Sequence, residues 1–339
     1  MQGVRELTFA AKIEFLSRPS SYVDAPRVVE RVETHFAHVF LSRRFAYKIK
    51  KPFKFRQIDF SGIEGRRRSC EQEVVLNRRL AAPTYIGVVP LVWTGETLAL
   101  EGAGECVDWL VKMHRLPENR ALEQAALRGD VDDEDLSSVV AKLVRFYRST
   151  AVVPWTPSEY REHLEHRSAG DAAELIGTGA ELDAERIERI RGAQLEFLRT
   201  RADLVEPRAA EGRVVDAHGD LRPEHIFLNG DPQIIDCVEF SEELRWLDAA
   251  EEIAFLALEL ERLGADEVAK QVVALYAEAA RDRAPRELRA FYQSARAMVR
   301  ALLCAWRIVE QQNDSRWRVR AEWYLGVAAA SMGIGRRGG

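Results

Sequence analysis

The fold is decided by the stretch His218-Gly219-Asp220-Leu221-Arg222-Pro223-Glu224-His225, followed along the chain by Ile234-Ile235-Asp236-Cys237-Val238-Glu239. Short apolar runs lead into both segments, and the turn Asn229-Gly230-Asp231-Pro232 between them is a strong hairpin signal. We therefore expect Asp220 and Asp236 at strand ends, where a rigid element can aim each carboxylate into a cleft.

Two carboxylates at this spacing suit phosphoryl transfer. That chemistry needs one carboxylate to orient the attacking hydroxyl and accept its proton, and metal ligands to neutralise the phosphate oxygens. We assign the first role to Asp220, with His218 in the same catalytic segment, and metal binding to Asp236. The alternative is two turn aspartates placed by coincidence, which the combined pattern disfavours.

The segment is similar to the catalytic loop of protein kinases, H-R-D-L-x-x-x-N with D-F-G downstream. Here a glycine precedes the aspartate, and this H-G-D form resembles aminoglycoside and choline phosphotransferases, which are small-molecule kinases. The frames 47–52 (YKIKKP) and 73–80 (EVVLNRRL) look like an uncharacterised bacterial branch of the aminoglycoside phosphotransferase-like enzymes. The resemblance covers most of the chain.

This resemblance implies an α+β, bilobal protein-kinase-like fold, with a β-rich N-lobe and a larger helical C-lobe. It also implies ATP and Mg²⁺ in the cleft, and transfer of the γ-phosphate to a hydroxyl of an amino-sugar, sugar or amino-alcohol. Some relatives in this branch are fused to a P-loop domain, whereas this chain contains no Walker A sequence.

Two positions depart from the family pattern. His225 stands where the family usually carries asparagine. Mg²⁺ prefers hard oxygen ligands, so three roles stay open for His225: it ligates metal and favours Mn²⁺, contacts phosphate, or only braces the loop. Cys237 and Val238 replace the Phe-Gly of protein kinases, and Glu239 is a candidate for a further metal-site carboxylate.

The front of the chain carries a lysine in a strand pattern. His38–Leu41 and Phe45–Lys50 read as antiparallel strands, and alternation places Ala46, Lys48 and Lys50 on one face of the second. In the kinase strand V-A-I-K, alanine lies against adenine and lysine reaches the α- and β-phosphates. The resemblance assigns these roles to Ala46 and Lys48. Lys50 is the rival lysine, and a solvated lysine face is the alternative.

A helical stretch over 63–80 follows, with Glu73, Leu76 and Leu80 on one face. A buried carboxylate needs a partner because burying it alone is costly, so we predict an ion pair between Glu73 and Lys48. Glu71 is the weaker candidate, and ordinary helix surface is the alternative for both. The run Arg66–Arg68 is expected to be a solvated face.

Strands are expected over 86–93, 97–100 and 106–113, and an adenine-binding hinge over Met113–Leu116 that includes Arg115. No Gly-rich loop precedes Lys48, and the loop Thr34–His38 takes its place. Helices are then expected from near Glu118 and over 133–150, 157–167, 182–204, 246–263, 266–281, 285–312 and 316–331. Asp248 is expected to cap a helix and to steady the catalytic loop, and Arg245 to hold an anion or form a structural salt bridge.

Composition limits the function classes. The net charge of −5 and pI near 5.9 argue against a dedicated nucleic-acid binder, because phosphate-backbone binding needs a clustered cationic surface. The four cysteines are dispersed, which favours a reduced, cytoplasmic protein without disulfides or structural zinc. Charged residues interrupt the apolar N-terminal stretch, and no apolar run reaches membrane-spanning length, so neither secretion nor membrane insertion is expected.

The sequence thus predicts an N-lobe over 1–113 that binds nucleotide, and a C-lobe over 114–339 that carries the catalytic and metal loops. The first hypothesis is an ATP-dependent small-molecule phosphotransferase. The second is a nucleotide-binding pseudokinase with a regulatory role, in which His225 and the missing Gly-rich loop have abolished transfer. A protein kinase is disfavoured by H-G-D and by the lack of an A-P-E segment.

Overall fold

A computed structural model of the chain describes residues 7–34, 36–55, 58–311 and 314–335. The chain divides into two compact units. The sheet unit comprises Met1–Ala125 and Glu224–Leu244, and the helical unit comprises Ala126–Pro223 and Arg245–Gly339. An α+β fold with one β-rich and one helical unit, as expected for a protein-kinase-like chain, is confirmed.

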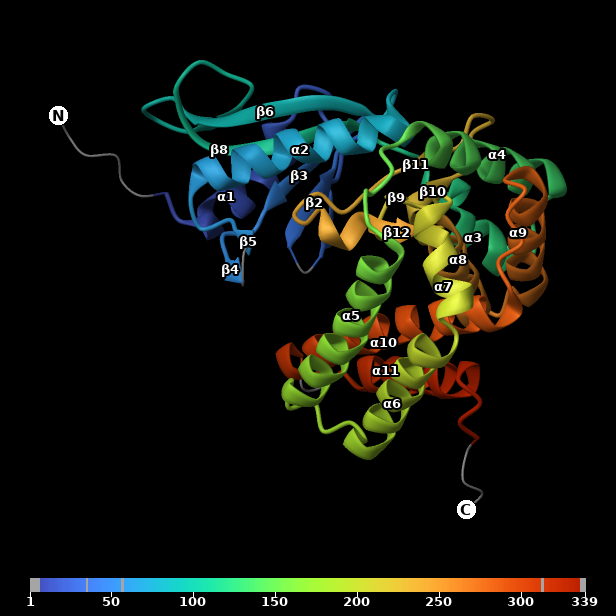
Figure 1. Cartoon of the computed structure of the whole chain (residues 1–339). Helices are drawn as coiled ribbons and strands as arrows, with labels where there is room; N and C mark the ends of the chain where they lie inside the picture. The colour runs from blue at the N-terminus through green and yellow to red at the C-terminus, as the bar shows by residue number, and fades with distance from the viewer. Residues whose placement is uncertain (1–6, 35, 56–57, 312–313, 336–339) are drawn as a thin grey trace. The chain divides into compact units, whose positions relative to one another are not determined.

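The sheet unit is built on six antiparallel strands in the order β1-β2-β3-β8-β6-β7 (Figure 1). The strands are β1 (Glu30–Glu33), β2 (Ala37–Leu41), β3 (Phe45–Lys50), β6 (Tyr85–Trp93), β7 (Leu98–Leu100) and β8 (Glu105–His114). Two small hairpins, β4 (Lys54–Phe55) with β5 (Ile58–Asp59) and β10 (Ile226–Phe227) with β11 (Gln233–Ile234), accompany it. The predicted strands and the hairpin around Asn229–Pro232 are confirmed.

Helices α1 (Phe9–Leu16) and α2 (Ile63–Ala81) cover opposite faces of β3. Tyr47 and Ile49 pack into a core with Leu16 of α1, whereas Ala46 packs into a second core with Cys70 of α2. The predicted alternation on β3 therefore holds, and it points Ala46, Lys48 and Lys50 toward α2.

A buried carboxylate ties both helices to the sheet. Asp108 of β8 is fully buried, lies 2.8 Å from Lys12 Nζ of α1, and accepts from two guanidinium nitrogens of Arg66 at 2.8 and 2.9 Å. The expectation that Arg66 belongs to a solvated arginine face was therefore wrong, because a buried carboxylate across the sheet attracts it. Arg68 of the same run is exposed.

The segment Glu224–Leu244 belongs to the sheet unit, which differs from the predicted division at residue 113. Two backbone amides of this segment donate hydrogen bonds to earlier residues of the sheet unit. The Leu228 amide donates to Arg120 O at 2.8 Å, and the Cys237 amide donates to Asn77 Oδ1 at 2.9 Å. The loop carrying Asp236 is thus built onto the same unit as Lys48.

The helical unit holds α4 (Asp133–Ser149), α5 (Pro157–Gly177), α6 (Ala184–Thr200), α7 (Ala202–Ala210), α8 (Ala249–Arg262), α9 (Asp266–Ala279), α10 (Arg286–Glu310) and α11 (Ser315–Ser331). The division between the units falls within α3 (Leu122–Arg128), which follows a 3₁₀ turn at Glu118–Arg120. Strands β9 (Val214–Asp216) and β12 (Trp246–Asp248) pair antiparallel. One hydrophobic core of this unit joins side chains of α5, α6, α8, α10 and α11.

Three predicted helices differ in their bounds. α5 continues ten residues beyond Arg167 to Gly177, because a buried face that includes Leu164, Ala172 and Leu175 outweighs the interior glycine. The stretch 182–204 forms two helices, since Arg201 leaves helical geometry at φ −121° and ψ 37°. Residues 246–248 form a strand because they pair with β9. Gln312, the predicted end of α10, lies outside the described residues.

Within the part of the chain that the structure describes, no helix combines the length and apolar character needed to cross a membrane.

Candidate active site

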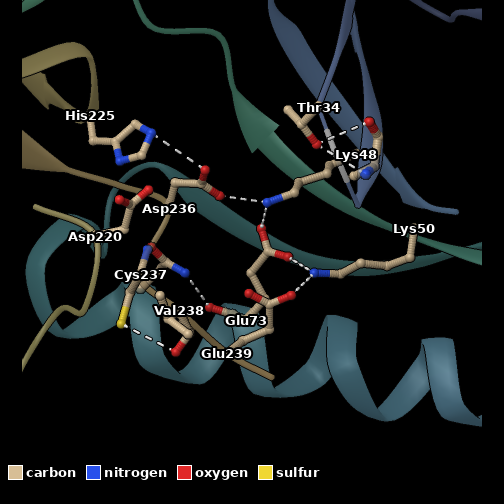
Figure 2. Close-up of polar contacts among 12 residues, drawn as sticks. Thr34, Lys48, Lys50, Glu73, Asp220, His225, Asp236, Cys237, Val238 and Glu239 are labelled. Atoms are coloured by element: carbon tan, nitrogen blue, oxygen red, sulfur yellow. Dashed lines mark hydrogen bonds and ion pairs between the residues drawn. The ribbon is translucent and has the colours of Figure 1, made fainter. Parts of the chain in front are cut away.

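Lys48 forms the ion pair that the sequence predicts. Its Nζ lies 2.9 Å from Glu73 Oε1 and 2.6 Å from Asp236 Oδ1 (Figure 2). Burial by itself would lower the pKa of Lys48, but the carboxylates of Asp236 and Glu73 raise it well above its usual value. Lys48 therefore stays charged and bridges α2 to the loop that follows β11.

Lys50 makes a second pairing on the same face of β3. Its Nζ contacts the other carboxylate oxygen of Glu73 and also Oε1 of Glu239, and its side chain is 1% exposed. Glu73 is thus shared by two lysines. Despite full burial, the positive charges of Lys48 and Lys50 hold the pKa of Glu73 below its ordinary value.

Asp236 adopts a backbone conformation that few residues other than glycine adopt, with φ at +64°. Two side chains of the sheet unit hold this turn. The Asp236 amide donates to the Tyr85 hydroxyl at 3.2 Å, and Asn77 accepts from the next amide while donating to Glu73 O at 2.9 Å. Strain of this kind is concentrated at functional sites in proteins.

The carboxylate of Asp236 is the candidate metal ligand. Its side chain is 36% exposed, and its Oδ2 lies 3.5 Å from His225 Nε2. Burial would raise its pKa, but Lys48 and His225 hold the pKa of Asp236 far below the ordinary value, so it is ionised. No set of three or more His, Cys, Asp or Glu side chains suited to a metal occurs among the described residues. The single carboxylate of Asp236 is compatible with Mg²⁺, because Mg²⁺ takes one or two protein carboxylates and completes its coordination shell with phosphate oxygens and water.

The predicted adenine contacts lie together on the sheet. Ala46 and Met113 are register partners of β3 and β8, and both belong to the core that faces α2. Arg115 lies beyond the end of β8, where it pairs with Glu30 at 2.7 Å and donates to Ser42 O at 3.0 Å. These contacts tie Arg115 to the ends of β1 and β2.

The turn expected to cover the phosphates joins β1 and β2. Thr34 closes it, since its Oγ1 accepts from the Ala37 amide at 3.0 Å and its own amide donates to Ala37 O at 2.9 Å. His35 lies outside the described residues. Phe36 stacks on Phe53 and meets the ring of Phe240 at 5.1 Å, so the turn contacts the segment that follows Asp236.

In the helical unit, Glu252 of α8 holds the His-Gly-Asp segment. It accepts from the amides of His218 at 3.0 Å and Gly219 at 2.6 Å, and from the Tyr147 hydroxyl at 2.8 Å. Gly219 has φ +88°, a value that favours glycine and explains why glycine stands between the histidine and the aspartate. Arg296 donates to Gly219 O at 2.9 Å.

His218 itself is fully buried, and its Nδ1 accepts from the Asp220 amide at 3.3 Å. This position fits support of the loop. The side chain of Asp220 is 25% exposed, with Oδ2 3.0 Å from Arg222 Nε. Asp220 is therefore the carboxylate of this segment that solvent or a ligand can reach.

Glu252, which the sequence analysis did not single out, contacts the segment directly. Asp248 caps α8 through the Ala250 amide, as expected, but its carboxylate pairs with the buried Arg208 at 2.6 Å. Arg245 is also structural, since it is 2% exposed and pairs with Asp216 at 2.6 Å. Glu251, Glu252 and Glu259 are all buried in α8, so the sequence alone does not single out Glu252.

No protein-family model matches the chain. Uncharacterized proteins of Mycobacterium tuberculosis and Mycobacterium bovis are 33% identical to it over 286 residues, which is 79% of this chain and 53% of each relative. The chain thus spans about half the length of the curated relatives it matches.

Solved structures similar to the chain include three small-molecule kinases. One is a choline/ethanolamine kinase family protein from Mesorhizobium loti, 11% identical, covering 95% of this chain and 94% of that one, with a TM-score of 0.48. A type VIII aminoglycoside-3'-phosphotransferase is 17% identical over 87% of this chain and 100% of that one, with a TM-score of 0.48. The choline kinase of Streptococcus pneumoniae is 14% identical over 89% and 93%, also with a TM-score of 0.48. The α+β fold is established by the chain's own strand order and helices.

Proposed function

We propose that the chain is an ATP-dependent phosphotransferase that moves the γ-phosphate of ATP to a hydroxyl of a small molecule. The observation that carries this proposal is the grouping of Lys48, Glu73 and Asp236, which come from a strand, a helix and a strained loop of one unit. An ionised carboxylate beside a charged, carboxylate-held lysine is what ATP phosphates and their metal ion require.

In the proposed reaction, the acceptor hydroxyl oxygen forms a bond to the γ-phosphorus while the bond from that phosphorus to the β-phosphate oxygen breaks. Asp220 orients the hydroxyl and takes its proton, and ADP leaves. Lys48 would hold the α- and β-phosphates, and Asp236, with His225 as a second donor, would hold Mg²⁺ or Mn²⁺. Such a metal would supply neutralisation of charge on the phosphate oxygens.

Asp220 is well suited to this role. The segment that carries it is fixed by Glu252 and Arg296, while its carboxylate stays partly exposed beside Arg222.

The proposed acceptor is an amino-sugar, a sugar or an amino-alcohol. Acidic residues on α5 give no preference for a cationic acceptor, because Glu159 caps the helix and Glu165 pairs with Arg161. The alternative function is a pseudokinase that binds nucleotide without transfer. The feature that favours it is His225, which stands beside Asp236 where the family pattern has an oxygen ligand.

The test is ADP formation from Mg-ATP and from Mn-ATP across a panel of amino-sugars, sugars, amino-alcohols and nucleosides. We expect acceptor-stimulated turnover that falls by about 100-fold or more in Asp220→Ala and Asp236→Ala. Nucleotide binding by the wild type, with no acceptor or metal giving turnover above these variants, would instead favour the pseudokinase.

A further inference from the structure

We propose that Lys50 and Glu239 form an ion pair that positions the metal-binding carboxylate of Asp236. Lys50 contacts the oxygen of Glu73 that Lys48 does not use. This inference rests on the proposed function, since it concerns the same site. It separates the two lysines of β3 by role: Lys48 binds phosphate, and Lys50 holds the loop.

The contacts form a chain of alternating charge. In order, the members are Asp236, Lys48, Glu73, Lys50 and Glu239, and each contacts the next (Figure 2). The two ends belong to one loop, three residues apart, and the middle belongs to β3 and α2. The loop is therefore pinned to the sheet unit at both ends of the same short segment.

The two ends of this chain of charges differ in solvent exposure. The Asp236 side chain is 36% exposed, whereas those of Lys50 and Glu239 are 1% and 6% exposed. The Lys50 ammonium group, 1% exposed and held between two carboxylates, is poorly placed to reach a nucleotide. Glu239 is also 3.4 Å from Ser69 Oγ of α2, so its carboxylate faces the helix, and the expectation that it serves as a further metal ligand is not favoured.

Asp236 depends on such outside support. The segment 235–240 forms neither helix nor strand, and Asp236 itself has φ +64°. Such a conformation persists only where surrounding contacts impose it. The supports are Tyr85 and Asn77 on the backbone, the Lys50–Glu239 pair, and Phe36 against Phe240.

Removing Lys50 would leave two carboxylates facing each other, because Glu73 and Glu239 contact the same ammonium group. Like charges in a buried site repel strongly. Glu239 would then move away from α2 and carry the loop with it, and Asp236 would lose its fixed direction. Replacing Glu239 with a neutral residue would also free this end of the loop, because the ion pair with Lys50 would be lost without leaving two carboxylates in contact.

The test compares Glu239→Gln, Lys50→Met and the double variant. The measured quantity is the metal-dependent gain, which is the ratio of ATP affinity with Mg²⁺ to ATP affinity without metal. ATP binding is measured by titration calorimetry with EDTA and with Mg²⁺, and Mn²⁺ binding by electron paramagnetic resonance. Lys112→Met is the matched control, because Lys112 lies on the neighbouring strand β8 beside Tyr47, on the face directed away from α2, and pairs with Glu101 with its side chain 13% exposed. Thermal unfolding confirms that each variant is folded, and Glu239→Gln, which keeps a hydrogen-bonding oxygen, is the mildest change.

We expect each single variant to reduce the metal-dependent gain and the Mn²⁺ affinity by about tenfold, as supports of metal ligands do. Affinity without metal should stay within about twofold, and the double variant should be no weaker than the singles, as members of one pair require. Lys112→Met should match the wild type.

Full metal-dependent gain in both single variants would overturn the inference while leaving the proposed function intact. Loss in Glu239→Gln alone, with Lys50→Met unaffected, would also overturn it, because Glu239 would then be a direct ligand. A wild type with no metal-dependent gain would overturn the proposed function and this inference together.

Discussion

At the scale of single residues, we propose Lys48 as the side chain on which nucleotide binding depends. It is buried, charged and held by carboxylates on two sides. Lys48→Met should therefore lower kcat/KM by about 100-fold and weaken ATP binding measured without turnover. Lys54→Met is the control, since Lys54 is 67% exposed and pairs with Asp59. Equal ATP affinity in wild type and Lys48→Met would contradict the role of Lys48.

Asp171 of α5 sets a pH dependence of stability. Burial raises its pKa from 3.8 to about 6, although Arg167 and Arg296 act in the opposite direction. Between these two pH values the folded state binds more protons than the unfolded state, so the free energy of unfolding falls as the pH rises through this range. The ionised carboxylate is thus unfavourable to folding at neutral pH.

Asp171→Asn should remove this penalty. We expect the variant to be more stable than the wild type at pH 8 by about 3 kcal/mol, and the difference to shrink toward zero at pH 4. Urea unfolding followed by circular dichroism at both pH values measures this. A variant that loses stability at pH 8 would show that Asp171 makes favourable ionic contacts in the folded protein.

At the scale of elements, α8 holds the loop that carries Asp220. Glu252→Ala would leave the amides of His218 and Gly219 without their carboxylate acceptor in a buried site. Lost hydrogen bonds to a charged group should lower the free energy of unfolding by about 3 kcal/mol, and turnover should fall with it. Glu267→Ala, at an 87% exposed ion pair on α9, should change stability by less than about 0.5 kcal/mol. Equal stability of the two variants would argue against Glu252 as the support.

The parts of the fold and of the candidate site that depend on neighbouring residues in the sequence could be predicted. Alternation along β3 placed Lys48 toward α2, helical spacing placed Glu73 on the inner face, and their ion pair is confirmed. The hairpin between Asp220 and Asp236 followed from its turn residues.

Pairings between distant segments could not be predicted in this way. Lys50 and Glu239 are 189 positions apart, and nothing in either local sequence specifies the other. Glu252 lies 34 positions from His218, and nothing in the local sequence distinguishes it from the neighbouring Glu251. Arg66 read as surface because its partner, Asp108, lies on a strand that is distant in sequence.

At the scale of the whole molecule, the two units carry separate buried ion clusters. Asp108 binds Lys12 and Arg66 in the sheet unit, and Arg208 binds Asp248 and Asp282 in the helical unit. Breaking either cluster leaves uncompensated buried charge, which costs about 3 to 5 kcal/mol. We expect calorimetry to show Asp108→Ala lowering one unfolding transition and Arg208→Met lowering another. Identical shifts of a single transition in both variants would show that the units unfold as one.

The most direct test of the central claim is transfer of radiolabelled γ-phosphate from ATP to the best acceptor, in wild type and in Asp220→Asn. The account predicts a phosphorylated acceptor from the wild type, a rate at least about 100-fold lower in the variant, and unchanged ATP affinity, because Asp220 contacts the acceptor and not the nucleotide. Transfer at the wild-type rate by Asp220→Asn would contradict the assignment of Asp220 as the base. Tight ATP binding with no labelled product from any acceptor would contradict the phosphotransferase itself.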